Sequence, residues 1–276
     1  MRNTLLSAAA FVALAIPGAA LAQDETASDL SGFYVGVNVA LDDAKDDAGD
    51  QLWFDPQRNG TYSPVLSTST NPNVFSPGFC KGYAGGNSPT QGCFDDGPKR
   101  DFSIKAGYDG QMGNIVAGLV GEYTFHGPSD ATTAFSTSPA SYTLVRKLDG
   151  IGALRGRLGY SPNGRAGFFY VTGGVAYGKM KHNFTTTNTV NTFTENNDDD
   201  WKLGGQIGAG AEIMHASGVA VNIEYLYNRF RDRDYYVGVG QGTALATGPF
   251  GTGTNIASSD RNLDFHSFRV GLSYKF

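Results

Sequence analysis

Beyond its N-terminal segment, this sequence lacks any apolar run long enough to cross a membrane as a helix. A helical span needs roughly 20 consecutive apolar residues, and the mean hydropathy of the chain is slightly negative, at -0.26. Basic residues are also fewer than acidic ones. The chain has 21 Lys and Arg and 26 Asp and Glu, so its formal net charge is -5. The composition therefore argues against a helical membrane protein and, since phosphate backbones attract clustered cations, against a nucleic-acid-binding protein.

The N-terminal segment has the features of an export signal. Arg2 precedes an apolar stretch at residues 5–16, and Ala20 and Ala22 supply the small residues of a cleavage site. The alternative is an uncleaved membrane anchor, but the stretch is shorter than a bilayer span. We therefore expect residues 1–22 to be a signal peptide that is cleaved after Ala22.

The C-terminal residues alternate strictly between apolar and polar side chains. One face carries Arg269 and Lys275, and the other face is apolar up to the terminal residue Phe276. A period of two with these faces is typical of a strand that has lipid on one side and a polar interior on the other. The apolar face consists of Phe268, Val270, Leu272, Tyr274 and Phe276.

Short turns and long connections alternate along the chain and divide it into expected strands. An even set of strands, with short turns at one end and long loops at the other, is the arrangement of an outer-membrane barrel. We predict an all-β fold, a transmembrane eight-stranded antiparallel up-and-down β-barrel over residues 32–276, with short periplasmic turns and long extracellular loops. Residues 23–31 would form a short periplasmic segment, and residues 42–100 the first extracellular loop. The expected strands are residues 32–41, 101–111, 114–125, 144–160, 166–179, 201–214, 219–230 and 262–276.

A soluble β-sandwich would show the same alternation, because it also buries one face of each strand. The export signal, the terminal aromatic residue, the two classes of connection and the aromatic residues near the strand ends favour the barrel. Those aromatics are expected to form two girdles at the membrane interfaces.

Charged residues within the expected strands keep to one face, which would line the barrel interior. Eight strands enclose a space that side chains fill, and buried charges must be paired or hydrated. We predict a salt-bridged plug, with Glu224 and Arg269 as a pair on adjacent strands; a narrow ion path is the alternative. The predicted lumen network is Lys105, Asp109, Glu122, Lys147, Asp149, Arg155, Arg157, Lys202, Glu212, Glu224, Arg269 and Lys275.

Three basic residues, Arg146, Lys179 and Arg229, depart from this rule and lie near the expected outer ends of strands. There they would contact lipopolysaccharide phosphates, or they would be solvated rim residues. The sequence pattern leaves both interpretations open.

The first extracellular loop is acidic at its start and contains both cysteines of the chain, Cys80 and Cys93. Two cysteines in one loop of an exported protein favour a disulfide. A metal pair is the weaker alternative, because no histidine is near them in sequence. The Gly-rich stretch 238–242 is interpreted as a flexible loop, and the acidic loop segments as solvated, with divalent-cation binding as the alternative.

Six segments of this chain carry a resemblance to a known family: residues 32–36, 118–123, 155–160, 170–178, 221–227 and 266–276. They are similar to segments of the opacity-type, porin-family outer-membrane proteins of alphaproteobacteria. The resemblance implies an eight-stranded surface barrel of a family known for major antigens, with roles in envelope integrity, host contact and, in some members, haem binding. The long first loop departs from the family pattern, and the terminal strand with Phe276 would be recognised by the barrel assembly machinery.

We therefore expect a surface protein with a structural and interaction role, without a cofactor, in contact with outer-membrane lipid and lipopolysaccharide and with a host or environmental ligand at its loops. A narrow pore for ions or small solutes is the main alternative. A loop-borne haem receptor has weak support from Tyr235, Tyr236 and the histidines. A lipid-modifying enzyme is disfavoured, because His266 and Ser267 are neighbours in a strand and point to opposite faces.

Overall fold

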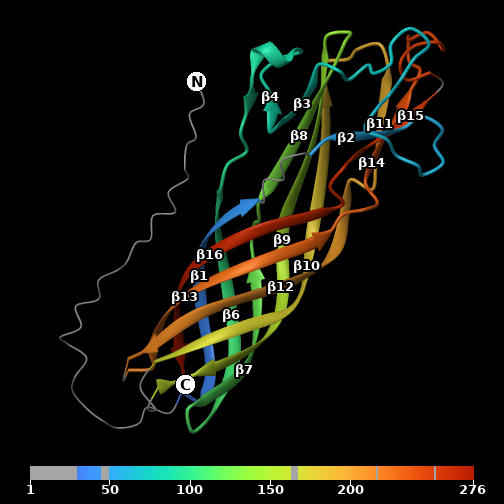
Figure 1. Cartoon of the computed structure of the whole chain (residues 1–276). Coiled ribbons are helices and arrows are strands. Elements are labelled where there is room, and N and C mark those ends of the chain that lie inside the picture. Colours follow the sequence, from blue (N-terminus) through green and yellow to red (C-terminus); the bar gives the residue numbers. More distant parts are fainter. Residues whose placement is uncertain (1–29, 45–49, 163–166, 216, 252) are drawn as a thin grey trace.

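A closed ring of eight antiparallel strands forms the body of the molecule (Figure 1). The computed structural model describes residues 30–44, 50–162, 167–215, 217–251 and 253–276, so the predicted signal peptide lies outside the described residues. All eight predicted strands are confirmed, several with longer outer ends. The ring consists, in order, of β1 (Gly32–Ala44), β6 (Lys99–Met112), β7 (Ile115–Thr124), β9 (Ala140–Tyr160), β10 (Gly167–Thr186), β12 (Asp199–Met214), β13 (Val219–Arg231) and β16 (Asn262–Lys275).

The ring closes between its first and last strands. β16 pairs with β13 on one side and with β1 on the other, in a register that runs from Tyr34 opposite Lys275 to Ala44 opposite Phe265. Within the described residues, closure gives each ring strand a paired neighbour on both sides. An open edge with unpaired backbone groups would not be tolerated in a bilayer.

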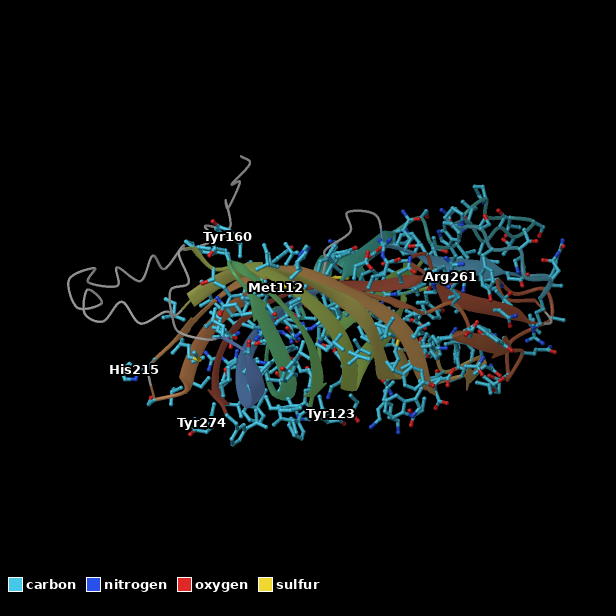
Figure 2. The ribbon with its side chains drawn as sticks, turned by 90° about the horizontal axis from the view of Figure 1, so that it is seen from below. Met112, Tyr123, Tyr160, His215, Arg261 and Tyr274 are labelled. Atoms are coloured by element: carbon cyan, nitrogen blue, oxygen red, sulfur yellow. A yellow bond between two sulfur atoms is a disulfide. The ribbon has the colours of Figure 1, made fainter. Side chains whose placement is uncertain are left out.

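The outer wall of the ring is apolar. Among the described residues, no helix is long and apolar enough to cross a bilayer. Tyr160 and Tyr274 lie near the end of the wall that carries the short turns, and Tyr123 lies farther toward the cap (Figure 2). Near the outer end, the rings of Tyr177 and Trp201 stack with centroids 5.1 Å apart. The exposed aliphatic residues of the wall include Val35, Val37, Leu119, Leu154, Val171, Ile207, Ile223 and Leu272.

The long connections fold into a second layer above the ring, which we call the cap (Figure 1). Besides the outer ends of β9 and β10 it contains a four-stranded sheet in the order β11-β14-β15-β2, a short hairpin of β4 and β5, and β3 paired with β8. Its strands are β2 (Leu52–Asp55), β3 (Gly78–Lys81), β4 (Tyr83–Ala84), β5 (Cys93–Phe94), β8 (Ser129–Ser136), β11 (Thr192–Asn196), β14 (Tyr236–Gly240) and β15 (Thr254–Ser258), with a 3-10 turn at Pro89–Gln91.

The cap has a hydrophobic core of its own. The ring of Phe75 lies 4.2 Å from Phe54 and 5.3 Å from Tyr142, measured between centroids. Val237 and Val239 of β14 are fully buried in the same cluster. The interpretation of residues 238–242 as a flexible loop is therefore wrong for the part in β14, where alternate valines face the core and the intervening glycines face outward.

A β-bulge in β9 reverses which side chains face inward. Gly178 of β10 pairs with Ile151 and Met180 pairs with Leu148, so β9 contains one residue more than β10 between these pairs. Gly150 adopts a φ of 112°, a conformation that side chains disfavour. An extra residue shifts the period-two pattern by one, so Leu148 above the bulge and Arg155 below it both face inward.

Truncation of the cap core should loosen the cap without unfolding the barrel. We expect Phe75→Ala to destabilise the cap by about 3 to 5 kcal/mol, because it leaves a cavity among packed rings. Amide hydrogen exchange should rise in β2, β14 and β15 and stay unchanged in β1 and β16. The control Leu245→Ala removes an exposed side chain and should have little effect; equal exchange in both variants would contradict an independent cap core.

Candidate functional site

Charged side chains meet across the middle of the barrel interior. The carboxylate of Glu122 lies at the centre, with Arg155 Nη2 3.1 Å from Oε2 and Arg269 Nη1 against Oε1. Asn38 Nδ2 donates a third hydrogen bond to this carboxylate over 3.1 Å. Arg155 Nη1 reaches Glu224 Oε1 at 3.2 Å. The network thus joins β1, β7, β9, β13 and β16 across the lumen.

A second group of ion pairs lies closer to the end of the barrel that carries the short turns and the C-terminus of the chain. Arg157 contacts Asp109 with two nitrogen atoms and Glu212 with Nη1 at 3.1 Å. Lys275 Nζ lies 2.8 Å from Asp109 Oδ2. The guanidinium of Arg157 also lies 4.7 Å from the ring centroid of Tyr34. Such paired, hydrogen-bonded and stacked contacts are what a buried guanidinium requires.

Nine of the twelve residues of the predicted network lie in these groups or beside them. Lys105 belongs to the lumen through its Nζ, which donates to Asn222 Oδ1 over 2.6 Å. The expected pair of Glu224 and Arg269 does lie side by side in the sheet register, yet each forms its ion pair with another strand. Neighbouring side chains project in parallel, whereas those across a narrow lumen meet at their tips. The nine are Lys105, Asp109, Glu122, Arg155, Arg157, Glu212, Glu224, Arg269 and Lys275.

The other three predicted lumen residues lie at the cap end. Lys147 is exposed and Asp149 pairs with Lys181 at 2.5 Å, so the inward placement of Lys147 and Asp149 is wrong. The β9 bulge is the cause, because it turns odd-numbered residues outward above Gly150. Lys202 is buried, but it pairs with Asp200 and Asp234 at the junction with the cap.

Apolar layers lie next to the charged network. Toward the cap, Phe230, Phe265 and Leu263 pack with four other buried residues of β9 and β10. Toward the C-terminal end, Leu30 precedes β1 and packs against Phe168 and its neighbours. The charge-based prediction missed these residues, although the parity of Glu224 and Arg269 in their strands already assigns Phe230 and Phe265 to the interior.

A buried ionic cluster joins the barrel to the cap, and Arg146 is its centre. Arg146 Nε donates to Asp130 Oδ2 over 2.7 Å, and Arg146 Nη2 lies 3.2 Å from Asp260 Oδ2. Asp232 Oδ2 lies 3.9 Å from Arg146 Nη1 and 2.9 Å from His182 Nε2. The prediction of Arg146 as a lipopolysaccharide contact is therefore wrong, because the same bulge turns its side chain inward.

Tyr235 covers this cluster. Its ring stacks on His182 with centroids 4.0 Å apart, and its hydroxyl donates to Glu195 Oε2 over 2.7 Å. Only 5% of Tyr235 is exposed, so the interpretation of Tyr235 as an exposed haem contact is wrong. Burial and Glu195 raise the pKa of the Tyr235 hydroxyl, which keeps it protonated.

Lys179 and Arg229 lie on the outer surface near the cap end. Lys179 Nζ pairs with Asp199 at 3.1 Å, and Arg229 makes two hydrogen bonds to Asp264. Each cation therefore has a counter-ion within the chain, a feature that the strand pattern did not indicate.

The disulfide between Cys80 and Cys93 is present and spans 13 residues of sequence. It links β3, which pairs with β8, to β5 of the short hairpin. The hairpin is thereby attached to the sheet that continues the barrel wall, and no free cysteine remains.

The histidines are distributed over separate places. His266 Nδ1 lies 2.6 Å from the Tyr225 hydroxyl on the outer wall, and His126 lies 3.8 Å from Asp149. His215 contacts Ser217 within a turn. Among the described residues, no group of three or more His, Cys, Asp or Glu is arranged to hold a metal ion.

Loss of the central carboxylate charge should destabilise the barrel strongly. Glu122→Gln would leave Arg155 and Arg269 without their shared counter-ion, and breaking a buried pair in this way costs about 3 to 5 kcal/mol. Urea-induced unfolding of the protein in lipid vesicles measures the change. The control Lys147→Gln alters an exposed charge and should stay within about 0.5 kcal/mol of wild type; similar losses for both would contradict the central role of Glu122.

The junction with the cap should open at low pH. Burial alone would raise the pKa of Asp232, but the hydrogen bond with His182 and the nearby charge of Arg146 outweigh burial and hold the pKa below its usual range. Such a carboxylate stabilises the fold above its unfolded pKa of about 4 and loses this contribution as the pH falls further. We expect amide exchange of residues 233–240, corrected for intrinsic rates, to stay constant from neutral pH to about 4 and to rise below it.

Asp232→Asn is the matched variant for this prediction, since it keeps the shape and removes the titrating group. Its exchange should be faster at neutral pH and should depend less on pH. A pH response as steep as that of wild type would assign the opening to other carboxylates.

Comparison with known proteins gives a family and several relatives. The family model described as outer membrane protein beta-barrel domain matches residues 6–276. The 31 kDa outer-membrane immunogenic protein of Brucella melitensis is 30% identical over 177 residues, which are 63% of this chain and 65% of that protein. The protein of the same name from Brucella suis matches to the same extent. The match thus spans slightly less than two thirds of the length of these relatives.

Solved structures of outer-membrane proteins are more distant. OprG from Pseudomonas aeruginosa has 12% identity and a TM-score of 0.47, with 91% of this chain and 98% of that chain covered. Neisserial surface protein A has 11% identity and a TM-score of 0.34, with 89% and 98% covered. Likenesses of this size carry no functional argument.

Proposed function

Since this chain belongs to the outer membrane protein β-barrel family, we propose that it is a closed surface barrel that carries a folded cap for contacts outside the cell. Its location is the cell outer membrane, where the apolar wall contacts lipid. The observation that carries the proposal is the sequence of layers in the interior, in which ion-paired side chains lie next to packed apolar side chains. The role is structural and interactive.

The lumen network supports a plug. A mobile ion would have to displace arginines that are already paired with Glu122, Glu224 or Asp109, and a buried charge that loses its partner is costly. Phe230 and Phe265, whose rings are stacked with centroids 6.1 Å apart, add an apolar layer above the charges. Such a layer opposes water as well as ions.

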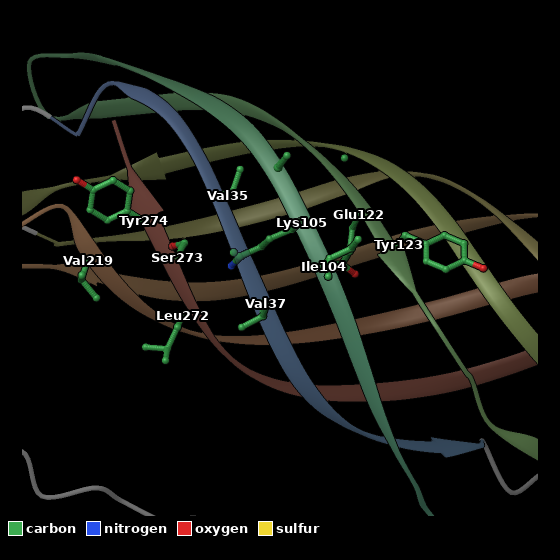
Figure 3. A pocket seen from close by; sticks show the side chains of 13 residues that line it. Val35, Val37, Ile104, Lys105, Glu122, Tyr123, Val219, Leu272, Ser273 and Tyr274 are labelled. Atoms are coloured by element: carbon green, nitrogen blue, oxygen red, sulfur yellow. The ribbon is translucent and has the colours of Figure 1, made fainter.

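A mainly apolar hollow of about 910 Å³ lies in the barrel wall at β13, β16, β1, β6 and β7. In Figure 3, Val37 and Leu272 extend from one side of this wall, and Lys105 and Glu122 lie among the strands behind it. Val35, Val37 and Leu272 are exposed and apolar, so we assign the hollow to lipid chains. The alternation along each strand separates this surface from the charged lumen.

Further contacts belong to the same proposal. Lys179 and Arg229 are kept as candidates for lipopolysaccharide phosphate, since 34% and 55% of their side chains are exposed near the cap. The exposed terminal residue Phe276 is the proposed contact with the barrel assembly machinery. A host or environmental ligand would meet the cap.

We propose no enzymatic activity, because the histidine contacts described above are dispersed.

Conductance measurement tests the closed barrel. Purified protein inserted into a planar lipid bilayer should give no steady current of general-porin size, because the charged and apolar layers obstruct the lumen. A general porin inserted into the same bilayer shows that the membrane can report channels. A steady conductance of similar size from this protein would overturn the plug and favour the pore.

A further inference from the structure

We propose that the groove between the β4–β5 hairpin and the ends of β9 and β10 binds a single neutral sugar residue. The cavity has a volume of about 240 Å³, which is below the roughly 300 Å³ at which pockets for drug-sized ligands begin. A ligand of one ring matches this size. Its outward access rests on the proposed function, which assigns the cap to the outside of the cell.

The lining of the cavity is polar and carries no charged side chain. One wall consists of five hydroxyl-bearing residues at the strand ends, of which Thr185 and Thr187 are exposed and Ser141 and Thr143 are buried. The other wall consists of the hairpin segment with an aromatic ring and glycine peptides. A charged ligand would find no counter-ion among these lining residues. An apolar ligand would make no use of the exposed hydroxyl groups of Thr185 and Thr187. The lining residues are Tyr83, Ala84, Gly85, Gly86, Ser141, Thr143, Thr185, Thr186 and Thr187.

Strand register explains how the hydroxyl groups come together. Thr143 of β9 lies between Thr133 of β8 and Thr185 of β10 in the paired strands. Their side chains therefore form a row on the face of the sheet opposite the cap core. Thr143 Oγ1 lies 2.8 Å from Thr133 Oγ1, which orients it within this row.

The hydroxyl groups at the end of the row are also held in place. Thr187 Oγ1 accepts a hydrogen bond from Ser141 N over 2.9 Å, and Thr186 Oγ1 donates to Ser141 O over 2.7 Å. Thr185 and Thr187 remain exposed to solvent. Polar groups fixed in this way lose little freedom on binding, which favours affinity for a small ligand.

The hairpin side of the groove is held by backbone bonds and by the disulfide. Gly82 N donates to Ala131 O over 2.7 Å, and Gly85 N donates to Gly92 O over 2.9 Å. A Cβ atom on Gly85 would lie 2.4 Å from Gln91 O, so the close turn requires glycine. The disulfide between Cys80 and Cys93 fixes the base of this hairpin beside β8.

Tyr83 supplies the aromatic ring of the groove. It is 39% exposed, and its ring offers an apolar surface beside polar groups. A sugar ring has the same two kinds of surface, with C–H groups on its faces and hydroxyl groups around its edge. A neutral hexose or N-acetylhexosamine at the end of a glycan is therefore the ligand class that fits the groove.

Ligand-observed saturation-transfer NMR tests this proposal on the full chain in phosphatidylcholine nanodiscs. Detergents with sugar head groups are avoided, because they would compete. The probes are the methyl glycosides of glucose, galactose, mannose and N-acetylglucosamine, with glucuronate and glucosamine as charged comparisons. We expect at least one neutral probe to bind with a dissociation constant of about 1 to 10 mM, and more tightly than either charged probe.

Two variants remove contacts without altering the strand pairing. Thr185→Val keeps the shape and deletes an exposed hydroxyl group, and Tyr83→Ala deletes the ring; each should weaken binding about fivefold or more. The control Thr194→Val changes an exposed hydroxyl in β11, away from the groove, and should bind as wild type. Reduction of the disulfide should also weaken binding, because the hairpin loses its anchor.

The proposal is overturned if no neutral probe binds, if a charged probe binds more tightly, or if Thr185→Val and Tyr83→Ala bind as tightly as wild type. Heat-modifiable gel mobility of every variant shows that the barrel is folded. The conductance of the same samples tests the closed barrel separately, so loss of sugar binding with an unchanged closed state refutes only the groove.

Discussion

The pairing of charged side chains inside a ring of eight strands is the constraint on which the rest of the structure depends. Eight strands leave an interior that side chains fill, so each inward arginine must find a carboxylate. Glu122 meets this need for Arg155 and Arg269 together. Because these partners come from three strands, the ion pairs also tie opposite walls together, and they do so at the depth where the outer wall is apolar.

The side chains that β9 directs inward differ in chemistry on the two sides of its bulge. Below it, Arg155 and Arg157 enter the charged network; above it, Leu148 enters an apolar layer and Arg146 the buried junction. One additional residue is enough, since a shift by one exchanges the two faces of a strand. The barrel interior thus changes from ionic to apolar and again to ionic toward the cap, which supports a closed lumen.

The cap is a folded layer because its strands bury aromatic and aliphatic side chains against one another. Phe54, Phe75 and Tyr142 come from segments far apart in sequence, so their association was not visible as a periodic pattern. His182 and Tyr235 join this core to the junction below. A rigid cap can present preformed surfaces, and the hydroxyl-lined groove beside the disulfide is one of them.

The sequence by itself determined the number of strands in the ring, their order and the inward face of most of them, because alternation is local and turn residues mark its ends. Nine lumen charges followed from the same local evidence, and the disulfide followed from the export signal and the presence of both cysteines in one loop. Only the tertiary structure decided which charges pair, as Glu224 and Arg269 illustrate, since partners across a lumen share no sequence spacing. It also decided the positions of Arg146, Lys147 and Asp149, because a single bulged residue reverses the faces of a strand without altering its composition.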